Sequence, residues 1–208
     1  MRTGQLFPAG KIDRIMDSTL GLRERKKAET RQAVHEAALR LTVEHGFDAL
    51  TVEAIADAAN ISRRTFSNYF AGKEDALLYG EERRIRTLVD QVRAEPADRP
   101  PWQALRGAVQ RLYEEVGVPE REWAVRARLA MKHPSLLARQ LANHAAFDRE
   151  LAQAIERRGP GGVNPRVLAA AFLAALRVAT HTWIEEEQAR PLHEVIDEML
   201  EQMALPFA

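Results

Sequence analysis

Apolar residues recur at spacings of three and four along almost the whole 208-residue chain. This period is that of a helix with one buried face, and no stretch shows the sustained alternation with β-branched or aromatic residues that strands favour. The pattern predicts an all-helical protein of about nine helices.

The first predicted helix covers about residues 25–45 and ends at Gly46, which tolerates the left-handed conformation. Two short helices follow: Thr51 would cap one of about seven residues, and Ser62 would cap another that reaches Tyr69. The EPADRPP stretch at residues 95–101 is the clearest boundary in the sequence. Further helices are predicted near residues 74–94, 102–116, 121–132, 135–158, 165–189 and 192–204.

The two short helices and their turn fit a helix-turn-helix motif supported by the first helix. Ala56 allows a close helix crossing, Ile61 fills the turn, and Phe66 and Phe70 would bury one face of the second short helix. Its other face carries hydrogen-bonding side chains and no acid: Arg63, Arg64, Thr65, Ser67, Asn68 and Tyr69. Arginine pairs bidentately with guanine, so this helix is expected to read the major groove. The alternative is a small helical hairpin with a solvated basic face.

The overall charge balance speaks against a nucleic-acid partner, but its distribution does not. The chain has 30 basic and 30 acidic residues, yet residues 1–31 contain eight basic and four acidic ones. Residues 23–31 read RERKKAETR, directly before the helix-turn-helix. Lys73, where the next helix begins, is expected to clamp a phosphate. Zero net charge still predicts modest non-specific binding to DNA.

Composition and motifs argue against catalysis. The chain has no cysteine, which excludes disulfides, thiol nucleophiles and thiolate zinc sites. None of its six histidines has a glutamate three residues earlier, as a ferritin-like di-iron site needs. No catalytic residue, metal or cofactor is expected. A helical-bundle enzyme and an architectural DNA-binding protein without a ligand remain the alternatives.

The ends and apolar stretches predict a cytoplasmic protein. Residues 1–22 lack sustained periodicity and are expected to form a flexible arm, in which Met16 competes with Met1 as the natural start. No signal peptide is recognisable. The longest apolar stretch, residues 167–176, ends at Arg177 and is too short to span a bilayer.

Residues 27–79 resemble the DNA-binding domain of the TetR family of bacterial transcriptional regulators. The matching motifs are AALRLTVEHGFDALTVEAIA, the turn into ISRRTF, and NYF followed by GKEDALL. Ser67 departs from the family, because many members have an aromatic residue there that packs on a phosphate, a contact that Asn68 or Tyr69 would then make. The resemblance implies a DNA-binding surface made of Arg25, Lys26, Lys27, Thr51, Ser62, Arg63, Arg64, Thr65, Ser67, Asn68, Tyr69 and Lys73.

By the same resemblance, Arg63, Arg64, Thr65 and Tyr69 face bases and adjacent phosphates. Thr51 and Lys73 contact the DNA backbone, and residues 25–27 lie near a neighbouring phosphate or the minor groove. The family binds palindromic operators as homodimers, most often as repressors, and a small molecule in the C-terminal domain releases the DNA. The chain would then divide into an arm (1–22), a DNA-binding domain (23–72) and a ligand-binding and dimerisation domain (73–208).

The apolar surface of the last two predicted helices resembles the dimer interface of the family. The helix from Pro165 is rich in alanine, and the last helix carries one apolar stripe. The predicted interface residues are Ala171, Ala175, Val195, Met199, Leu200 and Met203. The alternative is that these residues form the core of a single chain.

A ligand pocket is expected among the remaining helices, because an arginine within an apolar helix would seek an anionic group. The candidate ligand-binding residues are Trp123, Arg126, Leu129, His133, Phe147 and Trp183. The stretches RPPWQALRGAV, RARLAMKHPSLLARQL and LRVATHTWIEEE are similar to regulators of the mycofactocin-system type. That similarity implies a long-chain acyl-CoA or another lipophilic compound as the effector.

Overall fold

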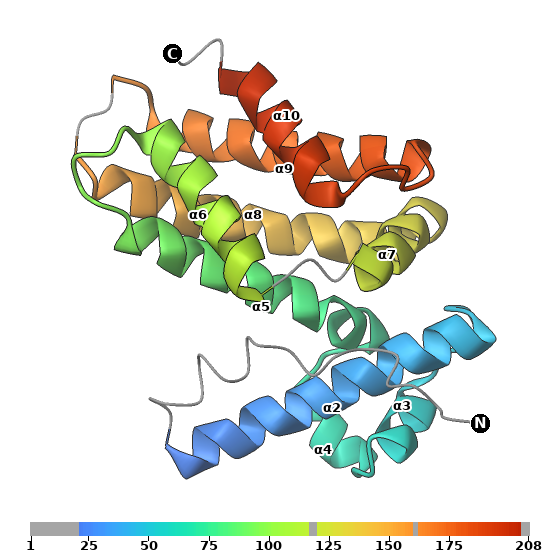
Figure 1. Ribbon diagram of the computed structural model, residues 1–208. Coiled ribbons are helices and arrows are strands. Elements are labelled where there is room, and N and C mark those ends of the chain that lie inside the picture. The colour runs from blue at the N-terminus through green and yellow to red at the C-terminus, as the bar shows by residue number, and fades with distance from the viewer. Residues whose placement is uncertain (1–20, 117–119, 160–161, 205–208) are drawn as a thin grey trace. The chain divides into compact units, whose positions relative to one another are not determined.

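The structure, a computed structural model, describes residues 21–116, 120–159 and 162–204, so most of the predicted arm lies outside it. The described residues form nine α-helices and no strand, which confirms the predicted fold class (Figure 1). The helices are α2 (Leu22–His45), α3 (Val52–Ala58), α4 (Arg63–Ser67), α5 (Lys73–Ala94), α6 (Pro101–Val116), α7 (Glu120–Lys132), α8 (Pro134–Glu156), α9 (Pro165–Glu185) and α10 (Leu192–Ala204).

Contacts divide the chain into two compact units. The first unit contains α2, α3, α4, the start of α5 up to Glu82, and residues 121–139. The second contains residues 83–120 and the chain from Gln140 onward. Both α5 and α8 contribute residues to each unit, so neither helix belongs wholly to one of them.

The core of the first unit forms where the short helices turn their apolar residues toward α2. Val34, Ala38 and Ile55 are fully buried. Phe66 and Phe70 are buried as the spacing predicted, with ring centroids 5.6 Å apart. Burial of a large aromatic side chain contributes about 2–3 kcal/mol, so this pair fixes which face of α4 points outward.

Local chemistry sets the ends of α3 and α4. The Thr51 hydroxyl accepts a hydrogen bond from the Ala54 N–H at 3.1 Å and caps α3. Asn60 has φ of 55° in the turn, a left-handed conformation that asparagine tolerates. Ser62 caps α4 by accepting from the Thr65 N–H at 3.0 Å. The helix ends at Ser67, two residues before the predicted end, because the Tyr69 N–H bonds to the Phe66 carbonyl in a tighter turn.

The second unit has its own core, in which α10 packs along α9 and also against α6. Trp102 meets Phe172 edge to face, with ring centroids 6.2 Å apart. Helix α9 ends at Glu185 rather than near residue 189, because Glu187 and Gln188 adopt left-handed conformations. The Gln188 N–H closes this end by donating to the Trp183 carbonyl at 3.0 Å.

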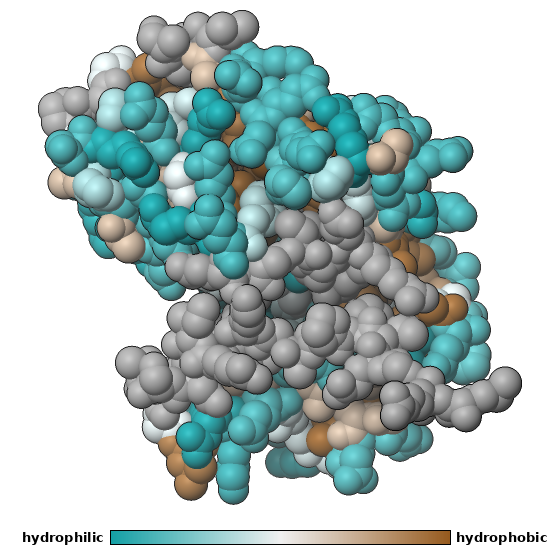
Figure 2. Space-filling model, viewed as in Figure 1, coloured by the Kyte–Doolittle hydropathy of each residue, from teal (hydrophilic) through white to brown (hydrophobic). Residues whose placement is uncertain are grey.

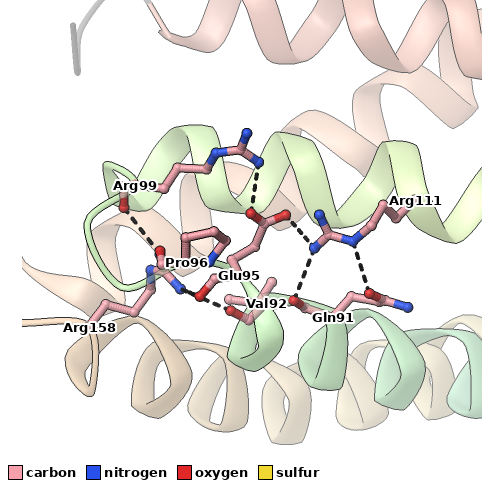
Figure 3. A network of polar contacts seen from close by, with 7 residues as sticks. All are labelled: Gln91, Val92, Glu95, Pro96, Arg99, Arg111 and Arg158. Atoms are coloured by element: carbon pink, nitrogen blue, oxygen red, sulfur yellow. Dashed lines mark hydrogen bonds and ion pairs between the residues drawn. The ribbon is translucent and has the colours of Figure 1, made fainter.

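A buried carboxylate organises the C-terminal end of α5 in the second unit (Figure 3). The Glu95 side chain has no exposed surface and forms ion pairs with Arg111 and with Arg99, the latter at 2.7 Å. Arg158 donates to the carbonyls of Val92, Glu95, Pro96 and Arg99, which follow one another along this helix end and its turn. Carbonyls at a helix C-terminus lack intrahelical partners, so Arg158 acts as the cap of α5.

One helix of the second unit is apolar on more than its packed side. Helix α9 is long and apolar enough to cross a bilayer by length and composition alone, and about a third of its most apolar stretch is buried. Val167 and Val178 are about half exposed on it, with Arg177 exposed beside them. The face of the molecule in Figure 2 is by contrast largely hydrophilic over the described residues.

Candidate nucleic-acid interface

The outward face of α4 carries the side chains that the sequence predicted. Arg63, Arg64, Ser67 and Asn68 are exposed. Thr65 is half-buried, because its hydroxyl lies 2.8 Å from the Ser62 hydroxyl at the start of the helix. The capped N-terminus therefore fixes the positions at which the two arginines leave the helix, which is the end that enters the groove in such motifs.

Tyr69 is held by Arg31, a residue outside the predicted DNA-binding surface. The Arg31 guanidinium, on α2, lies 5.3 Å from the centroid of the Tyr69 ring, within the range of a cation–π interaction. Arg31 closes the RERKKAETR run, but the 38 positions that separate the two residues hide their proximity. The contact places one more positive charge beside the end of α4.

Arg63 also has a partner outside the predicted DNA-binding surface, the acidic residue Glu53. Its Nη1 lies 3.0 Å from Oε1 of Glu53, in the first turn of α3. Both side chains are more than half exposed, at 74% for Arg63 and 56% for Glu53. An acid thus stands beside a helix that itself carries none.

The predicted basic cluster lies in the first turns of α2. Lys26 is exposed and Arg25 is half-buried. The Lys27 ammonium donates to Glu24 at 2.7 Å, and this hydrogen bond holds the pKa of the exposed Glu24 carboxyl below its ordinary value. Lys26 and Arg25 are thus the members of this cluster whose positive charge no such contact offsets in the described structure.

Lys73 has a structural partner on the loop between α2 and α3. Its ammonium donates to the Phe47 carbonyl at 2.9 Å and the Leu50 carbonyl at 3.0 Å, and lies 4.4 Å from the centroid of the Phe47 ring. An ammonium has three N–H donors, so one is left for a phosphate. These contacts fix the loop that leads into the Thr51 cap.

Three of the predicted ligand-binding residues lie in the first unit. Arg126 is almost completely buried, and its Nη1 lies 3.3 Å from Oε2 of Glu81 on α5. Leu129 packs against the core of the helix-turn-helix. The His133 ring lies 4.7 Å from the Phe47 ring, and its Nδ1 lies 3.3 Å from Asp48. Helix α7 and the residue that follows it therefore pack against α5 and the core of their own unit.

The other predicted ligand-binding residues are in the second unit or outside the described side chains. Phe147 is buried on α8, and Trp183 is buried on α9, where its indole N–H donates to the Arg190 carbonyl at 2.9 Å. The Trp123 side chain lies outside the described part of the chain. The six predicted residues thus do not gather within one unit.

The predicted dimer residues separate into two groups by burial. Ala175, Val195 and Leu200 are buried within the single chain, so they are core residues and offer no surface to a second copy. Ala171, Met199 and Met203 remain partly exposed. The sequence alone could not separate core residues from exposed ones, because a helix with two apolar faces shows a single broad stripe of apolar residues.

Two family models match the chain. Residues 35–79 match the model of bacterial regulatory proteins of the tetR family, which spans the helix-turn-helix. Residues 99–208 match the model of the MftR C-terminal domain, which is more than half of the chain. Both motif-based resemblances seen in the sequence are thereby confirmed.

Individual relatives agree with these matches. The chain is 32% identical over 173 residues to the HTH-type transcriptional regulator TcmR of Streptomyces glaucescens, covering 78% of this chain and 76% of TcmR. The fold is similar to Thermus thermophilus FadR, a TetR family transcriptional repressor, in complex with lauroyl-CoA, with a TM-score of 0.55 and 23% identity over 83% of this chain and 92% of FadR.

A second solved structure has the same fold. It is the complex of SmeT, from Stenotrophomonas maltophilia, with triclosan, with a TM-score of 0.61 and 18% identity over 86% of this chain and 91% of SmeT. The family consists of DNA-binding transcriptional regulators rather than enzymes. Helix α4 is capped and presents two exposed arginines, while Phe66 and Phe70 are buried. Family models match both the N-terminal and the C-terminal part of the sequence. The chain therefore belongs to the TetR family of bacterial transcriptional regulators.

Proposed function

We propose that this regulator is a cytoplasmic repressor that binds a palindromic operator as a homodimer and is released by a lipophilic or acyl-CoA-like effector. The observation that carries the proposal is the outward face of α4, where Arg63 and Arg64 leave a capped helix N-terminus. Residues 23–72 would read the DNA, and residues 73–208 would bind the effector and form the dimer. Residues 1–22 would be an arm.

Dimerisation is supported by the geometry of the reading helix and by α9. A single short helix contacts too few base pairs to select one site, so two copies about 34 Å apart would read successive major grooves. The exposed Val167 and Val178, together with Ala171, form an apolar face of α9 that a second copy would cover. Arg177 on the same helix makes a bilayer an unfavourable alternative.

The effector class is supported by the two solved relatives, which were crystallised with lauroyl-CoA and with triclosan. The buried aromatic residues Phe147, Phe172 and Trp183 give the second unit an apolar interior suited to a ligand of this kind. An effector bound there would favour a state in which α5, which contributes to both units, moves the reading helices apart. A coupling of about 1–3 kcal/mol is typical of such switches.

The proposal is tested by selecting bound duplexes from a random-sequence library with the full-length protein. We expect a palindromic sequence to be enriched, and sedimentation to show two protomers on each selected duplex. The double variant R63A/R64A should lose this selection by about 1–3 kcal/mol per lost base contact while remaining folded. If the wild-type protein enriches no sequence, or binds the selected duplex as a monomer, the proposal is wrong.

The effector is tested separately by thermal shift with lauroyl-CoA, lauric acid and triclosan. A ligand present at about 100 times its Kd should stabilise the protein by about 2.7 kcal/mol, and the true effector should also release the selected duplex. Stabilisation without release would indicate a ligand that does not act as an effector. No stabilisation by any of the three would contradict the proposed ligand class.

A further inference from the structure

Glu53 stands at the edge of the predicted DNA-reading surface and touches one of its two arginines. It is the second residue of α3, and Oε1 lies 3.0 Å from Nη1 of Arg63, the first residue of α4. Thr51, the N-cap two residues earlier, is expected to contact the DNA backbone. A carboxylate at this position would therefore lie near phosphates, where like charge is unfavourable. A positive group must offset this repulsion between the carboxylate and the phosphates.

The contact uses only part of the Arg63 guanidinium. A guanidinium has five N–H donors in a fixed plane, and its contact with Glu53 is made through Nη1. The opposite edge, formed by Nε and Nη2, is the one that can donate two parallel hydrogen bonds to O6 and N7 of a guanine. Arg63 can thus keep Glu53 and contact a base at the same time.

A phosphate contact on unrelated DNA differs from this arrangement. Non-specific binding consists of charge contacts with phosphates, which a flexible arginine makes by turning toward the backbone. If Arg63 turned away from Glu53, the carboxylate would remain unpaired beside the DNA. The acid therefore opposes phosphate binding by Arg63 and leaves its base contact unaffected.

We propose that Glu53 is a specificity-determining residue, which directs Arg63 toward a guanine edge and withholds it from the phosphates of unrelated DNA. The inference rests on the proposed function, because it requires α4 to read an operator. It adds an acidic residue to a surface that otherwise acts through basic, hydroxyl and amide side chains. The ion pair is exposed and contributes little to the stability of the fold. Its effect is therefore expected on the discrimination between operator and unrelated DNA.

The test compares Glu53→Gln with Asp57→Asn, which removes an exposed acid from the same helix and serves as the matched control. Each variant is titrated with the duplex selected by the wild-type protein and with a scrambled duplex of equal length, over a range of salt. For E53Q we expect about threefold to tenfold tighter binding to the scrambled duplex and a salt slope steeper by about 0.9. Affinity for the selected duplex should change by less than about twofold, so the specificity ratio falls.

Repeating E53Q in an R63A background separates the pair from a general charge effect. The proposal requires the change in specificity ratio to disappear there, because without Arg63 the unpaired carboxylate repels both duplexes alike and E53Q should tighten both equally. A change in the ratio that persists in the R63A background, an equal effect of D57N, or unchanged affinity of E53Q for the scrambled duplex would overturn it. These failures would leave wild-type selection of an operator intact, whereas failure of the proposed function would abolish that selection and both proposals with it.

Discussion

The guanidinium of Arg31 lies over the ring of Tyr69, 5.3 Å from its centroid, and so joins the middle of α2 to the end of α4. Tyr69 also connects to the core, because it packs against the buried residues of the first unit. One side chain thus sits between the hydrophobic core and a positive charge. Its orientation depends on both.

Replacing Arg31 should weaken operator binding without unfolding the protein. We expect R31A to cost about 1 kcal/mol, close to fivefold in Kd, because both the cation–π contact and one charge near the DNA are lost. Y69F, which keeps the ring and removes the hydroxyl, should retain the Arg31 contact. R40A is the control, since Arg40 is an exposed arginine on the same helix. Equal losses in R31A and R40A would assign the effect to net charge alone.

Replacing Lys73 should affect stability as well as DNA binding. K73M keeps an unbranched apolar side chain but removes the ammonium that lies over the Phe47 ring and its hydrogen bonds to the Phe47 and Leu50 carbonyls. We expect a loss of about 1–2 kcal/mol in the free energy of unfolding, measured by denaturant titration, because two carbonyls lose a charged donor. A phosphate contact would add a reduced salt slope of DNA binding. Unchanged stability in K73M would show that these hydrogen bonds are not maintained in solution.

The close packing around Glu95 should make Gly107 intolerant of a methyl group. A Cβ there would lie 2.7 Å from both Oε1 of Glu95 and Nη1 of Arg99. We expect G107A to destabilise the protein by about 1–3 kcal/mol, because the buried Glu95 carboxylate and the Arg99 guanidinium paired with it must move. Gly72 is a suitable control, since a Cβ there meets only the Glu74 carboxylate, at 3.3 Å. If G107A melts at the wild-type temperature while retaining its fold, the buried arrangement is looser than described.

Tyr113 should make stability depend on pH in alkaline solution. Burial, followed by the nearby Asp197 carboxylate, raises the pKa of the Tyr113 hydroxyl well above its ordinary value near 10, and the Arg84 guanidinium opposes this only in part. Above pH 10 the unfolded chain would therefore lose a proton that the folded chain retains. Stability should fall there with a slope of up to about 1.4 kcal/mol per pH unit.

The Tyr113 contribution is isolated by comparing Y113F with the wild type in denaturant titrations from pH 8 to about pH 11. The variant should lose less stability above pH 10 and show no difference in slope below pH 9. Y69F controls for removal of a phenol elsewhere. Parallel curves for wild type and Y113F over the whole range would contradict the raised pKa.

Helix caps and buried aromatic positions, which depend on local sequence pattern, were predicted correctly. The caps at Thr51 and Ser62 and the buried Phe66 and Phe70 follow from spacing and residue type, and the structure places them as expected. The end of α9 was missed because two consecutive left-handed residues, Glu187 and Gln188, are of types that normally continue a helix.

Long-range contacts could not be predicted in the same way. Nothing in the sequence links Arg31 with Tyr69, or Arg126 with Glu81, because the members of each pair lie far apart along the chain. The burial of Val195 and Leu200 depends on how α10 packs on α9 and α6, which a stripe of apolar residues does not specify. Periodicity therefore identified the elements, and tertiary packing decided which apolar face is core.

The Arg158 cap has a mechanical consequence for α5. Four carbonyl groups at and beyond the end of this helix accept hydrogen bonds from one side chain just after α8, beside a carboxylate that pairs with two further arginines. We therefore expect this end of α5 and the turn after it to fray little, and their backbone amides to exchange slowly with solvent deuterium.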